Sequence, residues 1–264
     1  MSLKISALNL GVFSVGQDQD FKPLGPDDKP GKGEIKLALN PFLIEQNDHL
    51  ILIDTGLGSF YRDDMTPVLL EKIAAQGYSD RDITDVICSH LHLDHAGALA
   101  HRENGYWELT FPDARIWLSG QEFSKVKNEL HEEMTDEYIS FLDARGNLRF
   151  IEDDPEPFDG LRFEVIGGHT EFSLAIFGDS GGKNYLMAGD VLGVRAHVNR
   201  KFAAKYDFDP KRSQMLREKL LEQAYRSKAL ILSYHDDGGP VYRLTGHDEK
   251  KGYTIITADQ DGTD

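Results

Sequence analysis

The feature that most constrains this chain is a cluster of histidine and aspartate side chains directly after an apolar segment. The sequence VICSHLHLDHAGAL places His90, His92, Asp94 and His95 within six consecutive positions, immediately after a run that is typical of a buried strand. An uncompensated polar group at the edge of a core costs roughly 2–7 kcal/mol. Four such groups together therefore indicate a compensating charge, and a bound cation is the simplest one.

The spacing within this cluster predicts two cation sites. Residues two apart on an extended segment point the same way, so His90 and His92 can reach a single point. The following DHAGALA sequence has helix-forming character, which would aim Asp94 and His95 at a second point a few ångströms away. Two pairs of ligand-type side chains therefore suggest two ions.

Three later strand ends supply the same chemistry. His169 in VIGGHT, Asp190 in LMAGD and His235 in LILSYHD each end or follow a predicted buried strand, so all of them can gather at one rim of the sheets. We predict the following ligand sets: His90, His92 and His169 for one ion, Asp94, His95 and His235 for the other, and Asp190 as a bridge. Each ion would then keep a position open to water, which is typical of catalytic sites.

The remaining sequence predicts a single mixed α/β sandwich domain over residues 1–264. A Gly- and Pro-rich segment at 16–32 is predicted to be a mobile loop. Strand-like segments at 35–45 and 49–56 are expected to be antiparallel neighbours in one sheet. Further strands are predicted at 115–119, 161–167, 173–179, 184–190, 229–235, 241–245 and 253–257.

Two helices are predicted from capping signals and from the spacing of apolar residues. The first covers residues 66–77, with Thr66 as N-cap and Pro67 in the first turn. The second covers residues 209–228, with Asp209 as its cap.

Composition excludes several classes of partner. The net charge of −16 disfavours nucleic acid and anionic membranes. No apolar run approaches the roughly 20 residues of a membrane helix, and the N-terminus lacks the pattern of a secretion signal. A single cysteine, Cys88, fits a reducing compartment, so we expect a cytoplasmic protein with a small-molecule substrate. Homodimerisation is a weaker expectation.

The motif resembles that of the metallo-β-lactamase superfamily. The family pattern H-x-H-x-D-H is matched at residues 90–95, and its later single ligands are matched by His169, Asp190 and His235. The LIDTGLG segment resembles the Asp-Thr-Gly turn of the family, in which Asp54 would orient the ligands. The resemblance implies an αββα sandwich, with two mixed sheets packed face to face and helices outside. It also implies two divalent ions, with zinc favoured and manganese or iron as alternatives.

Within this superfamily the sequence is most similar to the branch that contains N-acyl-homoserine lactone lactonases and methyl parathion hydrolase. Two departures leave the substrate open: the usual HTPGH reads HTEFS here, and Gly193 stands where lactonases tend to carry a substrate-contacting Tyr. Cys88 precedes the motif, which disfavours a true β-lactamase, and the short acidic C-terminal tail disfavours a glyoxalase-II-like thioesterase.

The resemblance implies hydrolysis of a lactone or ester by a metal-bridging hydroxide, with Asp94 as the candidate for moving a proton. Hydrolysis of phosphotriesters or phosphodiesters is the main alternative. An oxidoreductase with one iron, similar to persulfide dioxygenases, and a module that uses its metal only for folding are alternatives from other classes. Four residues are candidate substrate contacts: Phe21, His197, Tyr206 and Tyr234.

Overall fold

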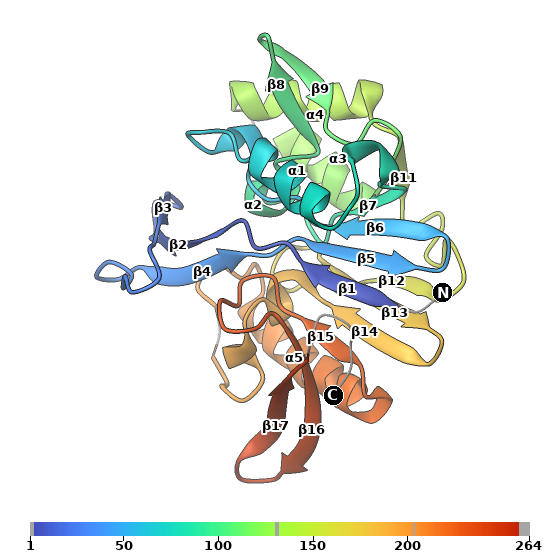
Figure 1. Ribbon diagram of the computed structural model, residues 1–264. Coiled ribbons are helices and arrows are strands. Elements are labelled where there is room, and N and C mark those ends of the chain that lie inside the picture. The colour runs from blue at the N-terminus through green and yellow to red at the C-terminus, as the bar shows by residue number, and fades with distance from the viewer. Residues whose placement is uncertain (1–2, 130–131, 203, 259–264) are drawn as a thin grey trace.

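The computed structural model describes residues 3–129, 132–202 and 204–258. Its centre consists of two six-stranded sheets, with helices on the outer side of each (Figure 1). The first sheet has the order β1-β5-β6-β7-β10-β11 and is mixed, because β1, β5 and β6 pair antiparallel while β7, β10 and β11 continue in parallel. Its strands are Lys4–Ala7, Phe42–Gln46, His49–Ile53, Asp85–Ile87, Arg115–Leu118 and Leu148–Phe150, in that spatial order.

The second sheet has the order β12-β13-β14-β15-β16-β17 and is also mixed, with one parallel pair, β14 and β15. Its strands are Leu161–Val165, Leu174–Ser180, Lys183–Met187, Leu230–Leu232, Val241–Asp248 and Gly252–Thr257. At the bottom of Figure 1, the hairpin of β16 and β17 extends beyond the body of the sheet.

The helices form the two outer layers. The α-helices are α1 (Thr66–Ala75), α2 (Leu93–Ala96), α3 (Gly120–Glu129), α4 (Glu133–Arg145) and α5 (Pro210–Ser227). Short 3-10 helices are η1 (Gly58–Phe60), η2 (Asp80–Asp82), η3 (Gly189–Leu192) and η4 (Arg195–His197). Helices α1, α3 and α4 lie beside the first sheet and α5 lies beside the second (Figure 1). The predicted αββα sandwich with two mixed sheets is confirmed.

Apolar side chains that point alternately to the two faces of the strands form two hydrophobic layers. In β15, Leu230 and Leu232 face the layer between the sheets, whereas Ile231 faces the layer beneath α5. Successive strand residues point to opposite faces, so a continuous apolar strand can serve both layers. From α5, Leu220 and Ala224 pack into the second layer.

Two smaller sheets flank the sandwich. One has the order β3-β2-β4, with strands Phe21–Pro23, Gly11–Val15 and Ile35–Leu39, and the other pairs β8 (Ala100–Glu103) with β9 (Tyr106–Leu109). The predicted segment 35–45 is therefore divided. Its second half, in β5, pairs antiparallel with β6 as predicted, but its first half, β4, pairs with β2 in another sheet. The segment 16–32 is not wholly a loop, because β3 pairs with β2.

The capping predictions had opposite outcomes. Asp209 caps α5 as predicted, since its carboxylate accepts the backbone N–H groups of Lys211 and Arg212. The prediction for Thr66 was wrong. It is the first residue of α1, and its backbone N–H donates to the side chain of Asp64.

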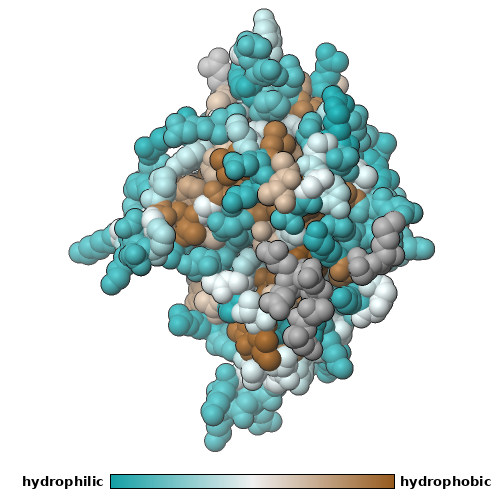
Figure 2. All heavy atoms as spheres, in the orientation of Figure 1, coloured by the Kyte–Doolittle hydropathy of each residue, from teal (hydrophilic) through white to brown (hydrophobic). Residues whose placement is uncertain are grey.

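The surface agrees with the composition. On the face shown in Figure 2, most residues are hydrophilic and the hydrophobic ones form only small patches. Among the described residues, no helix is both long and apolar enough to cross a membrane.

Candidate metal centre

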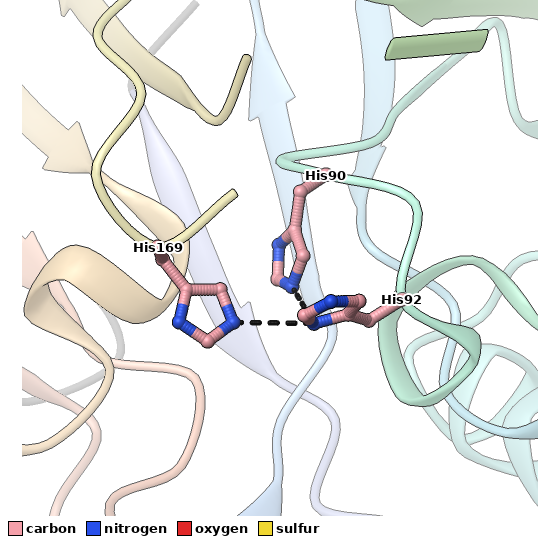
Figure 3. Close-up of side chains that lie close together, drawn as sticks. All are labelled: His90, His92 and His169. Carbon is pink, nitrogen blue, oxygen red and sulfur yellow. Dashed lines mark hydrogen bonds between the residues drawn. The ribbon is translucent and has the colours of Figure 1, made fainter. Parts of the chain in front are cut away.

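Four strand ends meet where the two sheets face each other. His90 lies three residues after β7 of the first sheet, while His169, Asp190 and His235 lie three or four residues after β12, β14 and β15 of the second. Side chains that are 145 positions apart in the sequence thus share one site, as predicted. Figure 3 shows the rings of His90, His92 and His169 turned toward one another.

The predicted ligands form compact groups. His92 Nδ1 lies 3.0 Å from His90 Nε2 and 3.1 Å from His169 Nε2 (Figure 3). Beside them, His95 Nε2 lies 3.2 Å from His235 Nε2. Three groups have ligand atoms within 4.8 Å of one another: His90, His92 and His169; His90, His95 and Asp190; and Asp94, His95 and His235.

Asp190 spans these groups. Its Oδ2 lies 3.3 Å from His169 Nε2, and its Oδ1 lies 3.1 Å from His235 Nε2 and 3.4 Å from His95 Nε2. When the Nε2 atoms of His95 and His235 are unprotonated, the buried Oδ1 atom has no hydrogen-bond donor. A buried carboxylate oxygen without a donor is rare in folded proteins and calls for an explanation.

Carboxylates behind two of the histidines determine where the imidazole protons lie. His95 Nδ1–H donates to Asp54 Oδ2 at 2.8 Å, and His169 Nδ1–H donates to Asp207 Oδ1 at 3.0 Å. A carboxylate can only accept here, so in the neutral ring the proton lies on Nδ1 and the inward-facing Nε2 carries a lone pair. Such outer partners also fix the orientation of each ring.

Neutral acceptors have the same effect on the other two buried histidines. His235 Nδ1 lies 2.9 Å from the backbone oxygen of Ala38, to which it donates. Ser89 Oγ donates its own hydrogen to Asp54 at 2.8 Å, so it accepts from His90 Nδ1 at 3.1 Å. Both histidines thus also present Nε2 lone pairs toward the site.

The inward-facing atoms therefore match the donor set of a cation site. In their neutral forms, His95 and His235 aim lone pairs at each other and at an orphaned oxygen of Asp190. His92 Nδ1 can carry only one hydrogen, so it cannot donate to both His90 and His169. Imidazole nitrogens and carboxylate oxygens suit Zn²⁺, Mn²⁺ and Fe²⁺. The His/Asp clusters are consistent with a dinuclear metal site.

The electrostatics differ between the two halves of the site. Burial lowers the pKa of His90, and it lowers the pKa of His92 to about 4, so both rings are neutral at pH 7. Burial also acts on His95, but the carboxylates of Asp94 and Asp190 outweigh it and raise the pKa of His95 well above its ordinary value. At His95 a proton therefore competes with a metal ion.

A cavity of about 570 Å³ opens onto these groups. Its polar floor includes His92, Asp94, His169, Asp190 and His235. Its walls are mostly apolar and come from the β2–β4 sheet, from α3 and α4, and from the segment after Asp190. The helices contribute Val126 from α3 and Ile139 and Leu142 from α4.

The structure assigns different positions to the other predicted site residues. Phe21, His197 and Tyr206 line the cavity. Tyr234 does not, because it is fully buried, its ring stacks on His95 at 4.1 Å, and its hydroxyl donates to the backbone oxygen of Asp94. The ring of Tyr234, predicted as a substrate contact, thus lies behind the ligands and not among the residues that line the cavity. Asp54, also fully buried, adopts a left-handed φ of 60° at the strand end.

Sequence reasoning missed three residues that support the cluster. Asp207 holds His169, buried Arg217 bonds Asp207, and Glu122 accepts the backbone N–H of Leu91 between His90 and His92. Burial raises the pKa of Glu122 to about 7. None of these residues belongs to a motif. The only available signal in the sequence was a charged residue on the inward-facing side of a helix, such as Arg217 on α5.

Comparison with known proteins gives a coherent set of relatives. An N-acyl homoserine lactonase of Bacillus thuringiensis is 26% identical over 231 residues, which cover 78% of this chain and 84% of that protein. The probable metallo-hydrolase Rv2300c of Mycobacterium tuberculosis is 23% identical over 207 residues, which cover 65% of this chain and 62% of that protein. The chain thus spans under two thirds of the length of the mycobacterial relative.

Solved structures show the same fold. A probable metal-dependent hydrolase from Staphylococcus aureus superposes with a TM-score of 0.78 at 20% identity, covering 98% of both chains. The dizinc quorum-quenching lactonase AidC, in complex with the product N-hexanoyl-L-homoserine, superposes with a TM-score of 0.75 at 23% identity, covering 97% of this chain and 95% of that one. At these identities, the likeness concerns the fold.

The family assignment depends on a separate match, to the model of the metallo-beta-lactamase superfamily. That match covers residues 37–235, which include every strand end that contributes to the cluster. Since the matched region is well over half of the chain, the protein belongs to the metallo-beta-lactamase superfamily and is a distant relative of the N-acyl homoserine lactonases.

Proposed function

We propose that this protein is a dinuclear metal-dependent hydrolase that opens a lactone or ester of a neutral, largely apolar small molecule. The observation that carries this proposal is the convergence of imidazole lone pairs and an orphaned Asp190 oxygen at the floor of an apolar cavity. The ligands of a structural metal site would enclose the ion inside the core, whereas these ligands face the open space of the cavity.

Seven side chains would hold the two ions. One ion would take His90, His92 and His169, the other would take Asp94, His95 and His235, and the Asp190 carboxylate would serve both. Zinc, the proposed metal, lowers the pKa of a bound water to about 7 and polarises a carbonyl oxygen. The protein residues then bind and orient the substrate, exclude water and manage protons.

Asp94 is the proposed proton carrier. It lines the cavity, and its Oδ2 lies 3.5 Å from His95 Nε2 and 3.6 Å from His235 Nε2. Tyr234 donates to the backbone oxygen of the same residue and so fixes the position of the turn. A carboxylate held at the boundary between the ligands and the cavity can accept a proton from an attacking water and pass it to the leaving oxygen.

The charge of the cavity wall favours an uncharged substrate. Among the described residues that line the cavity, Lys36 is the only lysine or arginine, and it is paired with Asp237 at 2.8 Å. An anionic phosphodiester would find no free cationic side chain there, which favours lactones, esters or phosphotriesters over phosphodiesters. Phe21, His197 and Tyr206 are the proposed wall contacts, and the side chains of α3 and α4 would receive an apolar tail.

Among these substrates we propose lactones first, and the similarity to N-acyl homoserine lactonases supports this choice. The test is to load the protein with zinc and assay N-acyl homoserine lactones of increasing acyl length beside an uncharged phosphotriester. We expect lactone opening, with KM falling as the acyl chain lengthens, since each buried methylene contributes about 0.8 kcal/mol. The Asp190→Asn variant is the matched inactive control.

Two results would redirect the assignment. Activity on the phosphotriester alone would replace the lactone with a phosphorus ester. One iron per chain, together with oxygen consumption on a persulfide, would replace the hydrolase with an oxidoreductase.

A further inference from the structure

Arg217 of α5 is one of the most completely buried charged residues, with 3% of its surface exposed. Its Nε donates to the backbone oxygen of Val191 at 2.7 Å, and its Nη1 donates to that of Phe202 at 2.6 Å. Its Nη2 lies 3.3 Å from Asp207 Oδ2. A single guanidinium thus contacts three points along one stretch of chain.

Each of these points is next to a different part of the site. Val191 follows Asp190 in the sequence, Phe202 lines the cavity, and Asp207 accepts the Nδ1–H of His169 through its other oxygen. Between η3 and α5, the described residues form only the short helix η4 and irregular backbone. Asn199 and Arg195 connect the first part of this segment to β17. The three bonds from Arg217, together with the exposed Lys201–Glu218 ion pair, connect it to the rigid helix α5.

A favourable salt bridge between Arg217 and Asp207 does not by itself explain why the two residues are buried together. Both side chains of the pair are at most 4% exposed, and burial of such a pair is usually neutral or unfavourable compared with apolar residues. Asp207 divides its two oxygens between the arginine and a histidine of the cluster. The pair therefore transmits the position of α5 to the ring of His169.

We propose that Arg217 and Asp207 act as one positioning unit that fixes the His169 ring and the Asp190 turn, and so tightens the binding of the ion held by His90, His92 and His169. This inference rests on the proposed metal centre. Neither residue touches the reacting atoms, so both are positioning residues.

The experiment measures metal retention in addition to activity. Wild type, Arg217→Met, Asp207→Asn and the double variant are loaded with Co²⁺ and dialysed against increasing concentrations of a chelator. The retained ions are counted per chain, and visible absorption reports their coordination. We expect each single variant to release one of the two ions at an effective affinity about 10–100-fold weaker, with the other ion retained as in wild type.

Arg212 provides a matched control on the same helix. Its Nε donates to the backbone oxygen of Ile166 at 2.7 Å, but no hydrogen bond connects it to the cluster. Arg212→Met should retain both ions and the wild-type absorption spectrum. Arg217→Lys, which can still donate to one or two of the three acceptors, should recover part of the affinity.

The outcomes separate this inference from the proposed function. A wild-type protein that binds no metal would overturn the centre itself. A wild type with two ions and an Arg217→Met variant that retains both equally well would overturn the positioning unit alone. If the affinity for both ions fell equally and the melting temperature also fell, Arg217 would have a general structural role instead. A double variant no worse than the worse single variant would support one unit, whereas additive losses would contradict it.

Discussion

The two ends of strand β7 show how differently one protein can treat buried polar groups. At the start of the strand, Asp85 is fully buried, and at its far end His90 is almost as deeply buried. Asp85 is the first residue of the strand and His90 follows its last residue, Ile87, by three positions. They differ in whether the polar atoms find partners within the protein.

At the start of the strand the partners are complete. Asp85 accepts hydrogen bonds from Trp117 Nε1 at 2.8 Å and Thr84 Oγ1 at 2.8 Å, and it pairs with Arg115 at 2.8 Å and His49 at 2.9 Å. Every oxygen of the carboxylate has donors, so this network is self-sufficient. The network supplies hydrogen-bond partners for a carboxylate buried in the first sheet, and it needs no ligand.

At the far end, outer partners hold His90, His95, His169 and His235, yet the inward-facing atoms lack partners of their own when these rings are neutral. The Nε2 atoms of His95 and His235 then face each other 3.2 Å apart as two acceptors, and Asp190 Oδ1 has no donor. Burial alone therefore does not identify a functional site. An arrangement of acceptors without donors does, because it costs free energy until a cation arrives.

The largest expected difference between the two ends follows from metal removal. Chelation of the zinc-loaded protein should reduce lactone hydrolysis by about 1000-fold or more, because the ions supply several kcal/mol of transition-state stabilisation. Circular dichroism should remain native-like, since the Asp85 network and both hydrophobic layers contain no ligand. Activity should return when zinc is added back. Unchanged activity in the chelated protein would contradict the view that the far end of β7 depends on a cation.

Breaking the self-sufficient end should instead cost stability. Asp85→Ala leaves Arg115 without its partner and should reduce the free energy of unfolding by about 3–5 kcal/mol. Denaturant unfolding of the zinc-loaded protein measures this loss, and metal content should remain at the wild-type value. If the variant also released its ions at wild-type chelator concentrations, the two ends would not be independent.

Substitution of a residue that orients a metal ligand should instead weaken metal binding and have little effect on stability. Asp54→Asn keeps the shape of the side chain but removes the charge that orients His95. We expect the affinity for one ion to fall about 10–100-fold while the stability of the metal-free protein changes little. Isothermal titration with zinc gives the affinity, and thermal unfolding without metal gives the stability. A loss in stability as large as that of Asp85→Ala would contradict the comparison.

The smallest expected effect is a dependence of stability on pH at the Asp85 end. Burial opposes ionisation there, but the hydrogen bond from Arg115, together with those from Trp117 and Thr84, holds the pKa of Asp85 below its ordinary value. A lowered folded-state pKa means that this stabilisation is present above about pH 4 and is lost as pH falls through the folded-state value. Unfolding free energies of wild type and Asp85→Asn should converge as the pH is lowered from 5 toward 3. Parallel curves would contradict the assignment.

The sequence predicted the ligand cluster because its signal is local. Three histidines and an aspartate lie within six positions, and each later ligand follows an apolar run that can only be a buried strand. The same reasoning predicted the cap at Asp209, a matter of three neighbouring residues. It failed at Thr66, where the backbone conformation decided the outcome, and it did not foresee that the ring of Tyr234 stacks on His95 behind the ligands.

Short segments of the sequence were enough to predict the fold class, the strand ends that carry the site and the types of ligand there, because strand periodicity and residue type are local properties. Which atoms face one another depends on the packing of distant segments. Asp207 and Arg217 support His169 across 38 and 48 positions, and the cavity wall combines segments from both halves of the chain. Such partnerships depend on how two sheets and α5 pack together, and no local pattern in the sequence records that packing.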